Sequence, residues 1–239
     1  IGPGIIAAVA DAVGDPTLTL KIIGAVGDVD SAAPSYAMWD LSRLVANSTA
    51  LTAAFDQGAA GLMGRLHDLD DPDTTTFLSA LDDFMFRFGS RGPSEWDLHA
   101  HVWETKPELV LSAIDRMRFA SDDESPGRRH ADREHERDAI VAHVTEALAA
   151  DPEAQGQFVA GVASAARFVP GRERSKTSLI KVIHECRLAT WELGRRLVEA
   201  GGAGEPRDIC MLFLDEIDQA LGDPNWARET IADRQAYFD

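Results

Sequence analysis

The apolar residues of this chain recur at helical spacing along almost its whole length. In residues 74–88 they fall at intervals of three and four positions, which places them on one face of a helix. The members of this stripe are Phe77, Leu78, Leu81, Phe84, Met85 and Phe88. Pro72 precedes the stripe and Gly89 follows it, as is typical of a helix start and a helix stop. The same spacing predicts helices over residues 34–46 and from Pro107 onward.

The second half of the chain also has a helical pattern. A long charged helix is predicted over residues 128–150, and another begins at Pro152. We expect Pro170-Gly171 to break that helix, so that a new one runs over residues 172–200. Short helices are predicted over 215–221 and 225–238, and only residues 209–213 indicate a short extended piece. The sequence therefore predicts an all-α fold, an irregular multi-helix domain of roughly ten helices.

A polar, proline-containing stretch near residues 66–73 suggests a boundary in the chain. We expect an N-terminal helical subdomain over residues 1–66 and a helical substrate-binding domain over residues 67–239. The sequence starts at Ile1 without an initiator Met. We therefore expect it to be excised from a longer chain.

The charge balance excludes several classes of partner. The chain has 40 acidic and 23 basic side chains, which gives a formal net charge of −17. Such a surface repels phosphate backbones and anionic lipids, so we expect neither nucleic acid nor membrane as a partner. No apolar run is long enough for a membrane span, no signal peptide is evident, and the chain has only two cysteines. We expect a cytoplasmic protein with free thiols.

The sequence carries no strong motif for metal or nucleotide chemistry. There is no Gly-Lys pair for a phosphate-binding loop, and Leu188 stands where a zinc-protease motif starting at His184 needs its second histidine. His99 and His101 could share a metal, but no third ligand lies nearby in the sequence, so we predict no metal site. We expect Cys186 to be a buried, inert thiol.

One loop has more charged residues than a core needs. Arg91, Glu95 and Asp97 lie within seven positions, interleaved with glycine and Trp96. The structural interpretation is an arginine–carboxylate network that holds the loop on the helices, because each buried charge needs a partner. The functional interpretation is a substrate-binding loop. The residues alone leave both open.

A basic cluster opens the helix predicted over residues 172–200. Arg172 and Lys176 are four positions apart and so share one face of a helix. At a helix start they would lie beside free N–H groups and the positive end of the helix dipole, which together could bind a phosphate. The alternative is a solvated face on which Glu173 and other acids balance the charge.

These segments also carry a resemblance to a known family. The run Phe88-Gly-Ser-Arg-Gly-Pro-Ser-Glu-Trp-Asp-Leu98 and the later Trp103-Glu-x-x-Pro107 resemble the central helical domain of rifampicin phosphotransferases and phosphoenolpyruvate synthase-like proteins. So do the runs that contain Arg172 to Lys176, Arg187, Trp191 to Leu197 and Phe213 to Ile217. The resemblance covers residues 77–221, and residues 1–66 carry little of it.

The resemblance implies a function that the residues alone do not give. Such proteins join an ATP-grasp domain, a helical substrate-binding domain and a swivelling domain that carries a phosphorylated histidine. The resemblance implies that Arg172 and Lys176 are catalytic, contacting the transferred phosphate, and that the helical domain holds a small-molecule acceptor. Arg187 joins Arg91, Glu95 and Asp97 as a substrate-binding or loop-network residue.

The chain departs from that family in what it lacks. Neither an ATP-grasp glycine-rich loop nor the Ser/Thr-His motif of the swivelling domain is present. We expect no cofactor in this segment, ATP and Mg²⁺ in the parent protein, and a swivelling phospho-histidine domain as a partner in cis or in trans. The alternative is a non-catalytic helical binding or scaffold protein that is derived from the same fold.

Overall fold

The computed structural model describes residues 2–15, 17–24, 26, 30 and 32–238. In these ranges the chain forms α-helices and short 3₁₀ helices and no strand, which confirms the predicted all-α class. The residues group into two compact units. Unit 1 comprises residues 1–87 and 108–177, and unit 2 comprises residues 88–107 and 178–239.

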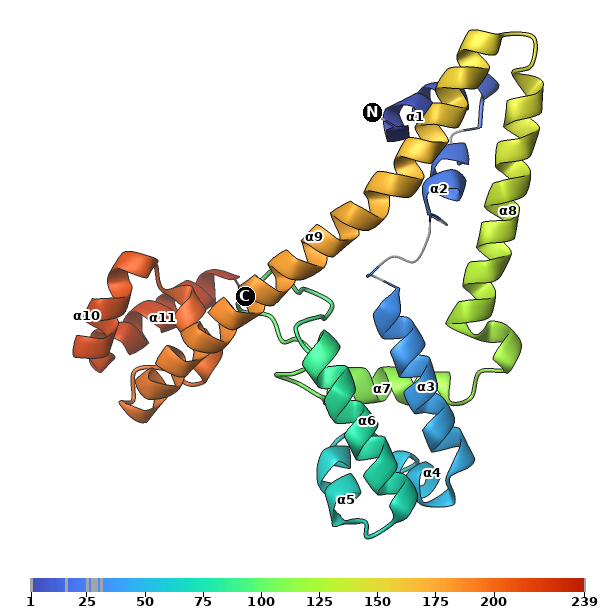
Figure 1. The fold of residues 1–239 in the computed structure, drawn as a ribbon. Helices are drawn as coiled ribbons and strands as arrows, with labels where there is room; N and C mark the ends of the chain where they lie inside the picture. Colours follow the sequence, from blue (N-terminus) through green and yellow to red (C-terminus); the bar gives the residue numbers. More distant parts are fainter. Residues whose placement is uncertain (1, 16, 25, 27–29, 31, 239) are drawn as a thin grey trace. The chain divides into compact units, whose positions relative to one another are not determined.

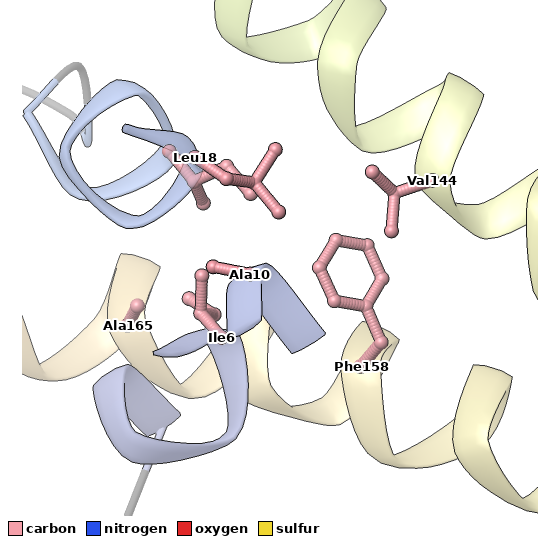
Figure 2. Packing of buried hydrophobic residues seen from close by; sticks show 7 residues of the cluster. Ile6, Ala10, Leu18, Val144, Phe158 and Ala165 are labelled. Atoms are coloured by element: carbon pink, nitrogen blue, oxygen red, sulfur yellow. The ribbon is translucent and has the colours of Figure 1, made fainter. Parts of the chain in front are cut away.

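One core of unit 1 joins the N-terminal helices to the two long ones. It is built from α1 (Gly2–Val13), α2 (Leu18–Ile23), α8 (Pro126–Ala147) and α9 (Pro152–Glu199). Figure 2 shows the ring of Phe158 pointing into this cluster, toward Val144 of α8 and Ala10 of α1. The buried members of the cluster are Ile6, Ala10, Leu18, Ile22, Val144, Phe158 and Ala165.

A second part of unit 1 is made by the five helices between these N-terminal and long helices. They are α3 (Ala33–Asn47), α4 (Thr49–Phe55), α5 (Leu62–Asp68), α6 (Pro72–Phe88) and α7 (Glu108–Met117). The predicted stripe on α6 is buried at Phe77, Leu81 and Phe84. Phe55 of α4 meets Phe77 edge to face, with ring centroids 5.7 Å apart. Helix α3 packs against both α4 and α7 (Figure 1).

Unit 2 packs the end of α9 against the C-terminal elements. These are η2 (Pro206–Met211), η3 (Leu214–Glu216), α10 (Ile217–Gly222) and α11 (Pro224–Phe238). Their buried core consists of Leu197, Ile209, Leu212, Ala220, Ala227 and Ile231. At Gly194 a Cβ atom would lie 1.8 Å from the carbonyl oxygen of Pro206, so only glycine lets η2 approach α9 this closely. The extended piece predicted over residues 209–213 is wrong, because most of it is in η2.

The predicted break at Pro170-Gly171 is also wrong. Helix α9 runs without interruption over 48 residues, with Pro170 in its interior. A proline there removes one backbone hydrogen bond and costs about 3 kcal/mol. Packing on both sides of it outweighs that cost, because Phe158 and Ala165 are buried in unit 1 and Ile180 and Leu197 are buried in unit 2.

The boundary expected near residue 66 does not coincide with the division into units. Residues on both sides of it, up to Arg87, belong to unit 1. Unit 2 instead takes up the loop that follows α6 and the last part of α9. How the parent protein divides into domains stays a prediction. Within the ranges that the structure describes, no helix is both long enough and apolar enough to cross a membrane.

Replacing Phe158 should test the unit 1 core. Phe158→Ala removes a fully buried ring from the cluster of Figure 2 and should lower the free energy of unfolding by about 3–5 kcal/mol. Phe168→Ala is the matched control, because Phe168 lies on the same helix and is 66% exposed. Its effect should stay within about 0.5 kcal/mol. Urea unfolding followed by circular dichroism measures both, and equal losses would contradict the assigned core.

Candidate functional site

The loop of unit 2 that follows α6 folds back on itself. The Trp103 amide donates to the Arg91 carbonyl at 2.9 Å, and the Glu104 amide donates to the Gly89 carbonyl at 3.0 Å. At Gly92 a Cβ atom would lie 3.0 Å from the Cα of Val102 and 3.3 Å from the carbonyl oxygen of His101. A side chain at Gly92 would therefore push apart the two arms of the loop.

An ion pair closes the tip of this loop. The Nε of Arg91 lies 2.6 Å from Oε2 of Glu95, and the two side chains are only 11% and 9% exposed. The contact agrees with the structural interpretation of the sequence, in which an arginine–carboxylate network holds the loop in place. A buried arginine–carboxylate pair orders a loop because separating it leaves a charge without a partner.

Arg187 of α9 fastens the loop to the helix. Its side chain is fully buried, and its Nη2 donates to the backbone carbonyls of Glu95 at 2.8 Å and Asp97 at 2.9 Å. Burial lowers the pKa of this guanidinium, and the negative charges of Asp97 and Glu95 oppose that shift. Within the described part of the chain, the buried Nε of Arg187 has no hydrogen-bond partner.

Two further side chains on the same face of α9 complete the attachment. His184 lies 3.0 Å from the carboxylate of Glu104 through Nε2 and 3.2 Å from Nη1 of Arg187 through Nδ1. Since an arginine can only donate, His184 carries its proton on Nε2 and accepts at Nδ1. Trp191 donates from Nε1 to the carbonyl of Leu98 at 2.9 Å.

His184 and Trp191 were not singled out as site residues from the sequence. The signal for them is their spacing, because residues 184, 187 and 191 share one face of a helix. His101 also packs against Trp191 edge to face, at 5.2 Å between ring centroids. Burial lowers the pKa of His101, and the nearby positive charges of Arg207 and Lys106 lower it further.

The attached loop forms one wall of a cavity of about 1240 Å³ in unit 2. Loop residues 96–99, α9, residues 209–214, η3–α10 and α11 all contribute to its lining. The lining residues are Trp96, Asp97, Leu98, His99, Thr190, Leu193, Ile209, Cys210, Met211, Leu212, Phe213, Leu214, Ile217, Asp233, Arg234 and Tyr237. The surface they form is largely apolar, which suits an organic ligand.

The predicted site residues fall into two groups. Arg91, Glu95, Asp97 and Arg187 come together in unit 2, and of these only Asp97 lines the cavity. Arg172 and Lys176 belong to unit 1 and lie on α9. The side chain of Arg172 is 79% exposed and pairs with Glu173 at 3.0 Å.

The helix start predicted at Arg172 is wrong. Because α9 begins at Pro152 and continues through Pro170, Arg172 and Lys176 lie in the interior of a helix. The backbone N–H groups there bond within the helix, so no free N–H groups and no dipole end face an anion at this position. Any phosphate affinity of the pair must come from the two side chains themselves.

The predicted burial of Cys186 is also wrong. Cys186 is exposed on α9, and the half-buried thiol is Cys210 in the cavity wall. Burial, followed by the charge of Asp97, raises the pKa of Cys210, so this thiol is protonated at neutral pH. Among the residues that the structure describes, no three His, Cys, Asp or Glu side chains are grouped so that they could hold a metal ion.

The comparisons with known proteins give one family. A family model described as the rifampicin phosphotransferase fourth domain matches residues 2–173. The match includes the N-terminal residues, so the expectation that residues 1–66 carry little of the resemblance is wrong. Its end at residue 173 leaves the cavity-lining residues of α9 to α11 outside the matched range. The search of curated proteins gave no significant match.

Removing the guanidinium of Arg187 should destabilise unit 2. In Arg187→Met, two backbone carbonyls and Nδ1 of His184 lose their donor, which should lower the unfolding free energy by about 2–4 kcal/mol. Four of the five tryptophans lie in unit 2, so tryptophan fluorescence during urea unfolding reports mainly on this unit.

Arg195→Met provides the control for this measurement. Arg195 lies on the same helix, but it is half-exposed and pairs with Glu192 and Glu199 at the surface. Such pairs contribute about 0–1 kcal/mol. A loss for Arg187→Met no larger than that for Arg195→Met would contradict the role assigned to the buried guanidinium.

Proposed function

Because the chain belongs to the family of the rifampicin phosphotransferase fourth domain, we propose that it is the acceptor-binding domain of a phosphotransferase. The observation that carries this proposal is the cavity of about 1240 Å³ in unit 2. Its volume slightly exceeds the roughly 300–1000 Å³ usual for small-molecule sites, and its lining is mostly apolar. A large organic acceptor fits these properties better than pyruvate does.

In this proposal the domain supplies binding and the parent protein supplies the phosphoryl group. The family is named for a fourth domain, so its members have others. We place ATP, Mg²⁺ and a swivelling domain with a phosphorylated histidine in those other parts. This chain would hold the acceptor in the ordered cavity wall that Arg187 fastens to α9.

We further propose that Arg172 and Lys176 contact the transferred phosphoryl group. Their spacing of four positions within α9 puts both cations on one face of the helix. Fixed positive groups stabilise the charge that the phosphoryl oxygens carry in the transition state, which is the main contribution a protein makes to such a transfer. The exposure of Arg172 leaves its side chain accessible to a phosphoryl-bearing partner.

Filling the cavity should weaken acceptor binding. Thr190 lines the cavity from α9, whereas the neighbouring Ala189 is exposed and is not part of the lining. Thr190→Trp should raise the Kd for a large acceptor such as rifampicin at least about tenfold through lost space, and Ala189→Trp should leave it unchanged. Calorimetric titration of the 239-residue chain measures both. Equal affinities in the two variants would contradict the cavity as the acceptor site.

Removing the two cations should slow phosphoryl transfer without weakening acceptor binding. In the full-length gene product, assayed with ATP and Mg²⁺, Arg172→Ala and Lys176→Ala should each lower kcat by about 10²-fold to 10³-fold. Arg167→Ala is the matched control, since Arg167 is an exposed cation on α9 five positions before Arg172.

Unchanged kcat in both variants would contradict the role of the two cations in the transfer. A full-length product with neither a nucleotide-binding nor a phospho-histidine domain would contradict the phosphotransferase role itself and would favour the non-catalytic binding or scaffold protein.

A further inference from the structure

The positive and negative side chains that line the cavity of unit 2 differ in how far they are already paired with other residues. The lining includes one guanidinium, Arg234, and two carboxylates, Asp97 and Asp233. Arg234 forms a two-pronged ion pair with Glu216, with Nη1 at 2.6 Å and Nη2 at 2.7 Å from the two carboxylate oxygens. It also donates from Nη1 to the carbonyl of Met211 at 2.7 Å. The positive charge of Arg234 is therefore already neutralised within the wall.

This ion pair persists over the physiological pH range. Hydrogen bonds from Arg234, together with one from the amide of Phe213, lower the pKa of Glu216 to about 2. The guanidinium carbon of Arg234 also lies 4.5 Å from the ring centroid of Phe213. Both the charge and one face of the guanidinium are thus occupied, and an anionic ligand would have to displace Glu216 to reach it.

The two carboxylates, Asp97 and Asp233, form no direct ion pair with any residue that the structure describes, although the charge of Asp97 also interacts with that of the buried Arg187 guanidinium. Asp97 accepts one hydrogen bond through Oδ1, from the backbone amide of His99 at 2.9 Å. Asp233 is exposed on α11, next to Arg234. The formal net charge of −17 adds to the attraction that these carboxylates exert on a cation.

Aromatic rings stand beside these carboxylates in the lining. Trp96 is 52% exposed and adjoins Asp97 in the loop, and Tyr237 is 88% exposed one helical turn after Asp233. A cation over the face of tryptophan or tyrosine is attracted by the ring, and a flat apolar ligand can stack on it. The combination of carboxylates, solvent-exposed aromatic residues and a largely apolar lining matches one kind of molecule.

We propose that this cavity selects an aromatic ligand with an amine that is positively charged at neutral pH, in preference to an anion of the same size. Identifying that ligand as the phosphoryl acceptor rests on the proposed function. The charge and the aromatic character expected of the ligand follow from the lining residues alone. The charge preference and the phosphotransferase function can therefore be disproved separately.

Three naphthalene probes of matched size test the charge preference. They are 2-naphthylmethylamine, 2-naphthalenemethanol and 2-naphthoate, which are cationic, neutral and anionic at pH 8, where histidine side chains carry little charge. Calorimetric titration of the 239-residue chain at low salt should give the amine an affinity about tenfold above that of the naphthoate, with the alcohol between them. Equal or tighter binding of naphthoate would overturn the proposal.

Charge-removing variants locate the effect in the cavity. Asp97→Asn keeps an oxygen that can accept from the amide of His99, and Asp233→Asn keeps the size of the side chain. Each should weaken amine binding about threefold to fivefold and leave alcohol binding unchanged. Glu229→Gln is the matched control, because Glu229 is exposed on α11 and lies outside the lining.

The outcomes separate this inference from the proposed function. If Glu229→Gln weakens amine binding as much as Asp233→Asn does, the preference comes from the overall charge and the inference is overturned. If all three probes bind equally, the inference is also overturned, but the cavity remains an apolar acceptor site. If none binds, or if Thr190→Trp leaves alcohol binding intact, the cavity itself is excluded as the ligand site.

Discussion

The buried guanidinium of Arg187 is the interaction on which the candidate site depends. Moving a charged arginine out of water costs several kcal/mol, so it is tolerated only where its donors find acceptors. Here the acceptors are the backbone carbonyls of Glu95 and Asp97, together with His184. Those carbonyls belong to the loop that carries Trp96 and Asp97 into the cavity wall. Without Arg187, this wall would lose its attachment to α9.

Three arginines of unit 2 hold its loops and helices together, whereas the two carboxylates of the cavity lining form no ion pair in the described part of the chain. Arg187 holds the loop, Arg91 closes the loop tip on Glu95, and Arg234 holds α11 against residues 211–216. Each of these guanidinium groups is bonded to neighbouring residues of unit 2, and of the three only Arg234 lines the cavity. The charges that face the cavity are then mainly negative, although the wall is built with arginine. The same contacts that order the site therefore also set the sign of the ligand that it favours.

The sequence predicted the helices well where an apolar stripe and a cap coincide, as in α6 with Phe77, Leu81 and Phe84. It failed at Pro170, because the local cost of proline was outweighed by packing far away on both sides of it. The pair Arg91–Glu95 could be predicted from spacing within one loop. The cavity could not, since its lining joins residues 96–99, 190–193, 209–217 and 233–237, and no local pattern specifies how these segments pack.

The continuity of α9 also changes how its basic cluster could serve phosphoryl transfer. At a helix start, free backbone N–H groups and the positive end of the helix dipole would already face a phosphoryl group. Inside α9, Arg172 and Lys176 can bind one only through their side chains. Arg172 already pairs with Glu173, so an incoming phosphoryl group must compete with that carboxylate. A dianionic phosphoryl group with several acceptor oxygens competes well against a single exposed carboxylate, which contributes at most about 1 kcal/mol. In the proposed transfer, Arg172 would therefore exchange Glu173 for the phosphoryl group when that group arrives.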